Sequence, residues 1–469
     1  MGSPPAAPAR SNPLDLILLA LLLGLVLALP LVPNGALGTL ATYDMCRALQ
    51  GMMLLAAACL AWVRREPTHC NLGLCILLSV LAWLSCSTAA VPVIAWRDAV
   101  WTAALLLLVP TLGRLLRDAK IRGHLLFAIV VGQFAYVLLA SAMLMYGLLV
   151  EHLIAPWHGF PGFENPRFFN HSQTLTIPLL LAFSLRPQAA RPVRHLAAVA
   201  VVLHVFLIGV FLARATVVGL VIAVVIVAFT LREQRLLKTM LIHAALGAAV
   251  YVIGCKLLPL WLDIPEMPIF RDPNERGSIE ARLYLWQIAV QNLREHPWLG
   301  VGPMHFAHQV NGEAAHPHNV YLQIASEYGL PFALIAIAAV LMWLRRRFRL
   351  LRQDAGAEDT LLAMGCLTAI VSALIDGLFS GNFVMPISQT WMVLCAALLM
   401  ALQAPRADQT GVELPAWLAR IPSGCVALGL IVNLALMAGE LSQPEVHLGT
   451  GHSLRPEGNN PRFWLDGWF

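Results

Sequence analysis

Long apolar runs separated by short polar connections dominate the chain. An α-helix needs about 20 consecutive apolar residues to cross a bilayer. Runs of about this length lie at residues 14–33, 45–63, 72–90, 98–115, 124–149, 173–186, 194–213, 215–231, 239–260, 329–344, 360–380 and 385–403. A weaker run lies at 421–438, after the turn-rich stretch APRADQTGVELP. No alternating pattern typical of a membrane β-barrel accompanies them. The pattern predicts an all-α polytopic membrane protein with about twelve transmembrane helices, and a thirteenth if the last run also spans.

One long stretch of mixed polarity, from Trp261 to Phe332, interrupts these runs. We therefore divide the chain into an N-terminal membrane bundle of about nine spans (1–260), a loop outside the membrane (261–328), and C-terminal spans with a tail (329–469). The loop sequence SIEARLYLWQIAVQNLREHP predicts an amphipathic helix that starts at an N-cap on Ser278 and ends before Pro297. The apolar positions that form one face of this helix are Leu283, Trp286, Ala289, Val290 and Leu293.

Composition agrees with this prediction. Hydrophobic residues make up 59% of the chain and charged residues 12%, whereas soluble domains have about 45–50% and about 25%. The net charge of +5 comes from arginines and lysines in alternate short connections. Such a distribution reports membrane orientation, so we expect membrane lipids and no nucleic acid as partners.

The basic connections fix the predicted orientation. They place the N-terminus in the cytoplasm and the loops at about 150–172 and 261–328 on the other side. No eukaryotic retention or anchor signal is visible, so we expect a bacterial inner membrane with these loops in the periplasm. If the run 421–438 spans, the tail PRFWLDGWF is also periplasmic; otherwise it is cytoplasmic.

Three residues are the main candidates for chemistry. Arg214 lies between apolar runs, either as a cation snorkelling from a helix end or as a ligand for an anion at the outer membrane face. Arg282 lies in the predicted loop helix, either as a solvated charge or as a second anion ligand. His318 precedes the segment NVYLQIASEYG, which we expect to form a helix opened by this histidine. A histidine can act as a general base at neutral pH, and the alternative is a structural role at the span entrance.

Other polar residues form a second group. His305, His308, His316 and His318 crowd one part of the loop, but their spacing and the lack of a CxxC array disfavour a metal site. The shorter outer loop offers Glu164, Arg167, Asn170, His171 and Gln173 for the same site. Asp376 is an isolated carboxylate near the outer end of a span, suited to catalysis or to a buried ion pair. Further charges near outer span ends are Asp44, Arg47, Arg97 and Asp98.

Three segments resemble the O-antigen ligase family: LARATVVGL, IEARLYLWQIAVQNLREHPWLGVGP and HPHNVYLQIASEYGLP. These bacterial membrane glycosyltransferases share a core with O-antigen polymerases and protein O-oligosaccharyltransferases. The resemblance implies a GT-C-type helical fold and a donor glycan linked to undecaprenyl diphosphate. It also implies transfer to lipid A-core at the periplasmic face, with inversion and without a metal or other cofactor.

The resemblance also implies roles for individual residues. Arg214 and Arg282 would bind the diphosphate and assist catalysis, and His318 would be the general base. The residues that we expect in supporting positions are Asp376, His316, Asn319, Arg167 and His171. An O-antigen polymerase and a protein O-oligosaccharyltransferase use the same donor and remain alternatives. So does a non-enzymatic transporter of lipid-linked glycans, although no internal repeat is visible.

Overall fold

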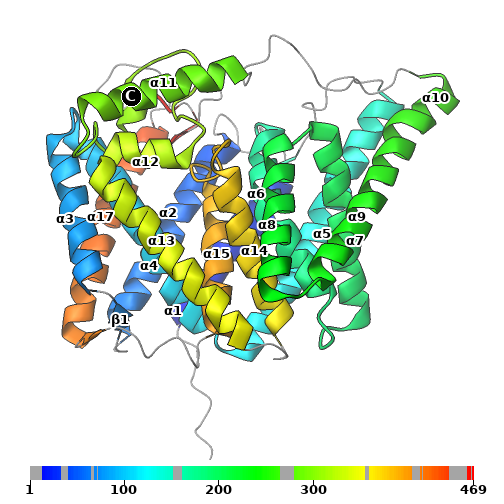
Figure 1. Ribbon diagram of the computed structural model, residues 1–469, viewed down its shortest axis with the longest axis horizontal. Helices are drawn as coiled ribbons and strands as arrows, with labels where there is room; N and C mark the ends of the chain where they lie inside the picture. Colours follow the sequence, from blue (N-terminus) through cyan, green and yellow to red (C-terminus); the bar gives the residue numbers. More distant parts are fainter. Residues whose placement is uncertain are drawn as a thin grey trace, which may run out of the picture.

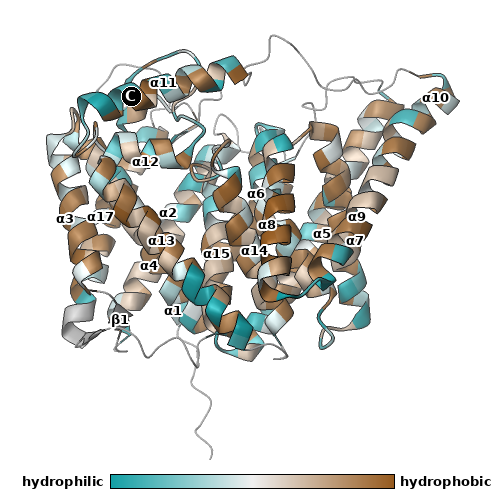
Figure 2. Ribbon diagram, viewed as in Figure 1, coloured by the Kyte–Doolittle hydropathy of each residue, from teal (hydrophilic) through white to brown (hydrophobic). Residues whose placement is uncertain are grey.

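The computed structural model describes residues 13–32, 41–64, 68–70, 72–151, 161–264, 279–353, 359–403, 412–414, 416–442, 462–465 and 467–469. Helices stand side by side as a bundle, and two further helices, α11 and α12, lie across one end of it (Figure 1). Hydrophobic residues cover most of the bundle, and hydrophilic residues collect toward its two ends (Figure 2).

The first half of the bundle contains these elements: α1 (Pro13–Leu23), a π-helix η1 (Gly24–Ala28), a 3₁₀-helix η2 (Leu29–Leu31), α2 (Thr42–Val63), α3 (Leu72–Thr88), α4 (Pro92–Leu115), α5 (Ala119–Leu149), α6 (Pro166–Ser184), α7 (Arg191–Phe211) and α8 (Arg214–Leu231). Polar caps start two of these helices. Asp118 Oδ1 accepts hydrogen bonds from the Lys120 and Ile121 amides before α5, and Asn165 Oδ1 accepts one from the Arg167 amide before α6.

The second half contains α9 (Arg235–Val252), a π-helix η3 (Ile253–Leu257), α10 (Leu258–Leu262), α11 (Ile279–Glu295), a 3₁₀-helix η4 (His305–His308), α12 (Val320–Tyr328), α13 (Leu330–Gln353), α14 (Thr360–Asp376), α15 (Pro386–Leu402) and α17 (Ala416–Ser442). Each apolar run predicted from the sequence is helical over most of its described residues, and the weak run at 421–438 lies within α17. The run at 239–260 belongs to a rod that continues from α9 through η3 into α10.

Eight of the described helical segments are long and apolar enough to cross a membrane: Pro13–Leu31, Thr42–Val63, Pro92–Leu115, Ala119–Leu149, Arg191–Phe211, Arg214–Leu231, Arg235–Leu262 and Arg420–Leu441. The helices α3, α14 and α15 are apolar but shorter. The chain is therefore a multi-pass membrane protein. The full number of spans and the GT-C assignment stay predictions.

The basic connections meet at one end of the bundle. Asp359, before α14, forms ion pairs with Arg122 at 3.2 Å and with Arg186 at 2.7 Å. At this end a short strand β1 (Thr68–Cys70) pairs antiparallel with β2 (Val412–Leu414), with Thr68 opposite Leu414. Apart from this two-stranded sheet, which joins the connections after α2 and after α15, the described residues agree with the predicted all-α fold.

The segment 279–328 lies at the opposite end, where α11 packs on α12 (Figure 1). The predicted N-cap Ser278 lies outside the described residues. The predicted apolar face is partly wrong, because Leu283 is 48% exposed whereas Leu285 is buried. The buried face of α11 runs through Leu285, Ala289 and Asn292, so it is rotated from the one that the apolar periodicity suggested.

Helix α14 occupies the middle of the bundle and packs against α6, α8 and α15. Its contact with α8 is close, since a Cβ on Gly219 would lie 2.9 Å from the backbone oxygen of Ser372. A glycine at this position lets the two backbones approach. The approach brings the ends of α6, α8 and α14 together.

Candidate functional site

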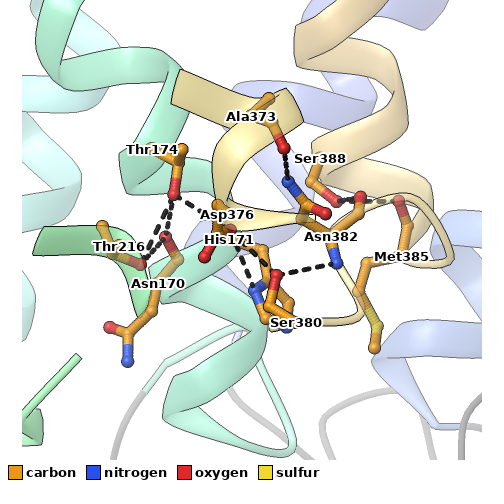
Figure 3. Close-up of polar contacts among 10 residues, drawn as sticks. All are labelled: Asn170, His171, Thr174, Thr216, Ala373, Asp376, Ser380, Asn382, Met385 and Ser388. Carbon is orange, nitrogen blue, oxygen red and sulfur yellow. Dashed lines mark hydrogen bonds and ion pairs between the residues drawn. The ribbon is translucent and has the colours of Figure 1, made fainter. Parts of the chain in front are cut away.

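A buried polar cluster joins α6, α8 and α14 at the end of the bundle that carries α11 and α12 (Figure 3). Asn170 and Thr174 come from successive turns of α6, and Thr216 comes from the first turn of α8. The Thr216 hydroxyl donates to the backbone oxygen of Asn170 at 3.2 Å, and the Thr174 hydroxyl lies 3.3 Å from the same oxygen. These contacts fix α6 and α8 relative to one another.

Asp376, the last residue of α14, is fully buried in this cluster. Its Oδ2 accepts hydrogen bonds from the hydroxyl of Ser380 at 2.9 Å and of Thr174 at 3.4 Å. The same oxygen lies 3.9 Å from His171 Nδ1 (Figure 3). Asp376 Oδ1 has no hydrogen-bond partner among the described residues. A buried carboxylate with an unused acceptor favours a site that is completed by another group.

Arg214 is the first residue of α8. The preceding Leu212 ends α7 in the left-handed conformation with φ of 49°, and the Arg214 amide donates to Leu212 O at 2.7 Å. This tight turn sets the arginine at the start of the helix and leaves it exposed. Helix N-termini carry partial positive charge, so a cation here adds to the attraction for an anion.

Arg282 lies in the first turns of α11, on the half-buried side of that helix. The helix is held over the bundle by Leu285 and Ala289, which pack with Phe306 and Ala314. The Trp286 indole Nε1 donates to Pro317 O at 3.0 Å. Through this bond, α11 is tied directly to the residue before His318.

His318 lies two residues before α12 and does not open the helix as predicted. Asn319 is the N-cap instead, and its Oδ1 accepts from the Tyr321 and Leu322 amides at 3.1 and 3.0 Å. His318 itself has φ of 50°, a left-handed conformation that costs free energy for a non-glycine residue. The buried ring of His316 packs against the His318 ring with centroids 4.2 Å apart. Together these contacts hold His318 in one orientation.

The structure brings together the residues that the sequence singled out separately. Arg282 interacts electrostatically with Arg167, Arg214 and Asp376. His318 interacts with Arg282 and Arg167. His171 interacts with His318, Arg167 and Arg282. Four separate parts of the chain, α6, α8, α14 and the segment 279–328, therefore converge on one site.

The site is dominated by positive charge. Burial lowers the pKa of Arg282, the neighbouring Arg167 and Arg214 lower it further, and Asp376 opposes them. None of the ion pairs among the described residues involves Arg214 or Arg282. Burial, Arg282 and Arg167 likewise lower the pKa of His318 to about 3. The imidazole is therefore neutral at neutral pH and can accept a proton, and the arginines can bind an anionic group.

Several other candidates have structural contacts instead. Gln173 Nε2 donates to His204 O at 2.9 Å, inside the bundle. Glu164 Oε1 accepts from the Tyr43 amide at 2.7 Å and so ties its loop to the start of α2. His305 Nε2 accepts from the Val91 amide at 2.9 Å. Within the described part of the chain, no group of three or more His, Cys, Asp or Glu side chains is placed to hold a metal ion.

The partners of Asp376 were missed in the sequence. Thr174, Thr216 and Ser380 are hydroxyl residues without a recognised spacing, and hydroxyls in membrane helices often bond to the backbone of their own helix. The one available signal was Asn170 and Thr174, which lie one turn apart at the polar start of an otherwise apolar helix. Their relation to Asp376 depends on the packing of α6 against α14.

Comparison with protein families gives one result. Residues 197–337 match the family model described as O-antigen ligase. The matched segment holds Arg214, Arg282, His316, His318 and Asn319, whereas Arg167, His171 and Asp376 reach the site from outside it. No curated protein matches the chain. The predicted resemblance to the O-antigen ligase family is confirmed for residues 197–337.

Proposed function

We propose that this protein is an O-antigen ligase that transfers O-antigen glycan from undecaprenyl diphosphate to lipid A-core. The transfer takes place at the periplasmic face of the bacterial inner membrane, with inversion and without a metal ion. The observation that carries this proposal is the convergence of Arg167 and Arg282 on His318. Arg214 adds a third positive charge beside Arg282, and Asp376 supplies the opposing charge. A diphosphate supplies the negative charge that such a site lacks.

The arginines assist departure of the lipid diphosphate. As the bond between the glycan anomeric carbon and the diphosphate oxygen breaks, negative charge grows on that oxygen. Arg214 and Arg282 stabilise this charge with planar, permanently cationic guanidinium groups. The role falls to a divalent cation in many other enzymes that transfer groups from diphosphates.

His318 takes the proton of the attacking hydroxyl. The acceptor oxygen attacks the anomeric carbon from the face opposite the diphosphate, which inverts the configuration there. The new glycosidic bond replaces the bond to the diphosphate, and the proton passes to the neutral imidazole. His316 and Asn319 orient His318 by ring contact and by capping α12, and Asp376 with His171 supports the site from the bundle.

Two separate phenotypes distinguish a ligase from a polymerase. Deletion of the gene in its host, followed by gel analysis of lipopolysaccharide, is expected to leave bare core with glycan retained on undecaprenyl diphosphate. A polymerase would instead leave core that carries one repeat unit. Wild-type lipopolysaccharide in the deletion strain would contradict both activities.

A further inference from the structure

The tail segment, residues 462–465 and 467–469, is buried against the end of the bundle that carries α11 and α12 (Figure 1). Arg462, Phe463, Trp464, Leu465 and Phe469 are each 4% exposed. A Trp- and Phe-rich tail that reaches this end agrees with α17 as a spanning helix. Such low exposure shows that the tail is part of the folded structure.

Helix α2 binds the backbone of the tail. The Tyr43 hydroxyl donates to Arg462 O at 2.8 Å, and Arg47 Nε donates to Phe463 O at 3.0 Å. Asp44 Oδ1 accepts from the Leu465 amide at 2.8 Å. These side chains follow one another on the outer end of α2, so they hold the tail in a fixed register.

Helices α4 and α17 bind its side chains. Arg97 and Glu440 form a buried bidentate ion pair with both contacts at 2.6 Å. The guanidinium lies over the Phe463 ring, 3.9 Å from its centroid, and the Trp464 indole donates to Glu440 Oε2 at 3.0 Å. An arginine over an aromatic face gains a cation–π attraction.

Arg462 connects the tail to α12. Its Nη2 contacts both carboxylate oxygens of Glu327, at 2.7 and 2.5 Å, and both side chains are buried. Burial raises the pKa of Glu327 to about 7, and the Arg462 charge acts against that rise. The carboxylate also accepts from the Phe306 amide at 3.3 Å. Arg462 thus supplies the charge that lets a carboxylate stay buried at the end of α12.

Helix α12 links the ion pair between Arg462 and Glu327 to His318. It has nine residues, and an isolated helix of that length is unstable in water. Its position therefore depends on contacts at both ends. At the start, the Val320 amide donates to Gly377 O at 2.8 Å, next to Asp376. At the end, Glu327 O accepts from the Ser85 hydroxyl and the Gly302 amide, beside the ion pair with Arg462.

We propose that Arg462 is a positioning residue: by pairing with Glu327 it holds α12, and with it His318, in the orientation that the site uses. The contribution to catalysis rests on the proposed function, whereas the contribution to the order of α12 does not. Among the described residues, no hydrogen bond or ion pair joins the tail to Arg214 or Arg282. The tail acts on the base alone, through a helix.

Hydrogen–deuterium exchange of residues 316–328 in the purified full-length protein tests the proposal without any substrate. Removing one partner of a buried ion pair leaves an uncompensated charge. Arg462→Ala is therefore expected to speed exchange across this segment by about 100- to 1,000-fold, and Arg462→Lys by less. The double variant Glu327→Gln with Arg462→Gln removes both charges and is expected to exchange much more slowly than Arg462→Ala. Exchange at the wild-type rate in both Arg462→Ala and Arg462→Lys would overturn the proposal.

Arg64→Ala is the matched control. It breaks the Arg64–Asp15 ion pair, at 2.7 Å, at the other end of α2, and is expected to leave exchange in α12 unchanged. Glycan transfer adds a second measurement: Arg462→Lys is expected to lower kcat with little change in the KM for the donor. If wild-type protein transfers no glycan but exchange responds as expected, the proposed function fails and the structural link stands. If transfer occurs and Arg462→Lys changes neither exchange nor kcat, the positioning role fails alone.

Discussion

Arg282 lies in an unfavourable electrostatic position, since Arg167 and Arg214 repel it and Asp376 offers the opposing charge. A diphosphate relieves this repulsion most in the transition state, when its charge is greatest. Arg282→Ala is therefore expected to lower the transfer rate by about 10²–10³-fold, the typical effect of removing a donor to developing charge. Arg282→Lys keeps the charge but loses the planar fork, so we expect partial recovery.

The exposed Arg294, near the other end of α11, provides the control. Arg294→Ala removes a cation from the same helix and is expected to retain near-wild-type transfer, measured in reconstituted vesicles. Near-full activity of Arg282→Ala in protein that inserts normally would contradict its assignment.

The pH dependence of transfer tests the state of His318. Burial, Arg282 and Arg167 hold the pKa of the free imidazole at about 3, below its ordinary value of 6.5. As the pH falls through 6.5, the base therefore stays neutral, and we expect no loss of kcat/KM there. A bound diphosphate offsets the arginines and raises this pKa, so the acid limb of kcat should lie at higher pH than that of kcat/KM. A fall of kcat/KM with an apparent pKa near 6.5 that occurs in the wild-type protein, and is absent from a variant without His318, would contradict the lowered pKa of this histidine.

At the scale of helices, the site depends on the close approach of α8 and α14. Gly219→Ala places a Cβ 2.9 Å from Ser372 O and 3.3 Å from Asp376 Cβ. Overpacking costs about 1–3 kcal/mol, more than the roughly 1 kcal/mol that alanine gains over glycine in a helix. We expect a lower thermal unfolding midpoint in detergent and weaker transfer.

Gly123→Ala, in α5, is its control because a Cβ there meets no atom within 4 Å. This substitution is expected to leave the midpoint unchanged or to raise it. A Gly219→Ala variant as stable and as active as Gly123→Ala would show that the α8–α14 contact does not limit the site.

The helices themselves could be predicted from the sequence, because a bilayer demands apolar runs of a set length. Arg214 also stood out, since a cation within apolar residues is costly and therefore informative. The face of α11 could not be predicted in the same way: Leu283 is exposed and Asn292 buried, because α12 and the segment 304–315 decide which side is covered. The contacts of Asp376 and of the tail join residues far apart in the chain, and no local pattern records such pairings.

At the scale of the whole molecule, the two ends of the bundle are predicted to face opposite compartments. Cysteines introduced singly at Trp298 and at Arg235, both exposed, test this orientation in a chain whose nine native cysteines are replaced by serine. A membrane-impermeant maleimide is expected to label Trp298→Cys in intact spheroplasts. The same reagent should label Arg235→Cys only after the spheroplasts are permeabilised. The reverse pattern would place the site in the cytoplasm.

Transfer by the purified protein in detergent, where there is no membrane to cross, tests directly whether the protein is a ligase. Wild-type protein is mixed with a glycan linked to undecaprenyl diphosphate and with lipid A-core, and the products are separated by gel electrophoresis. We expect glycan attached to lipid A-core with release of undecaprenyl diphosphate, and we expect His318→Ala to lose this product. No transfer by folded wild-type protein, or undiminished transfer by His318→Ala, would contradict this expectation.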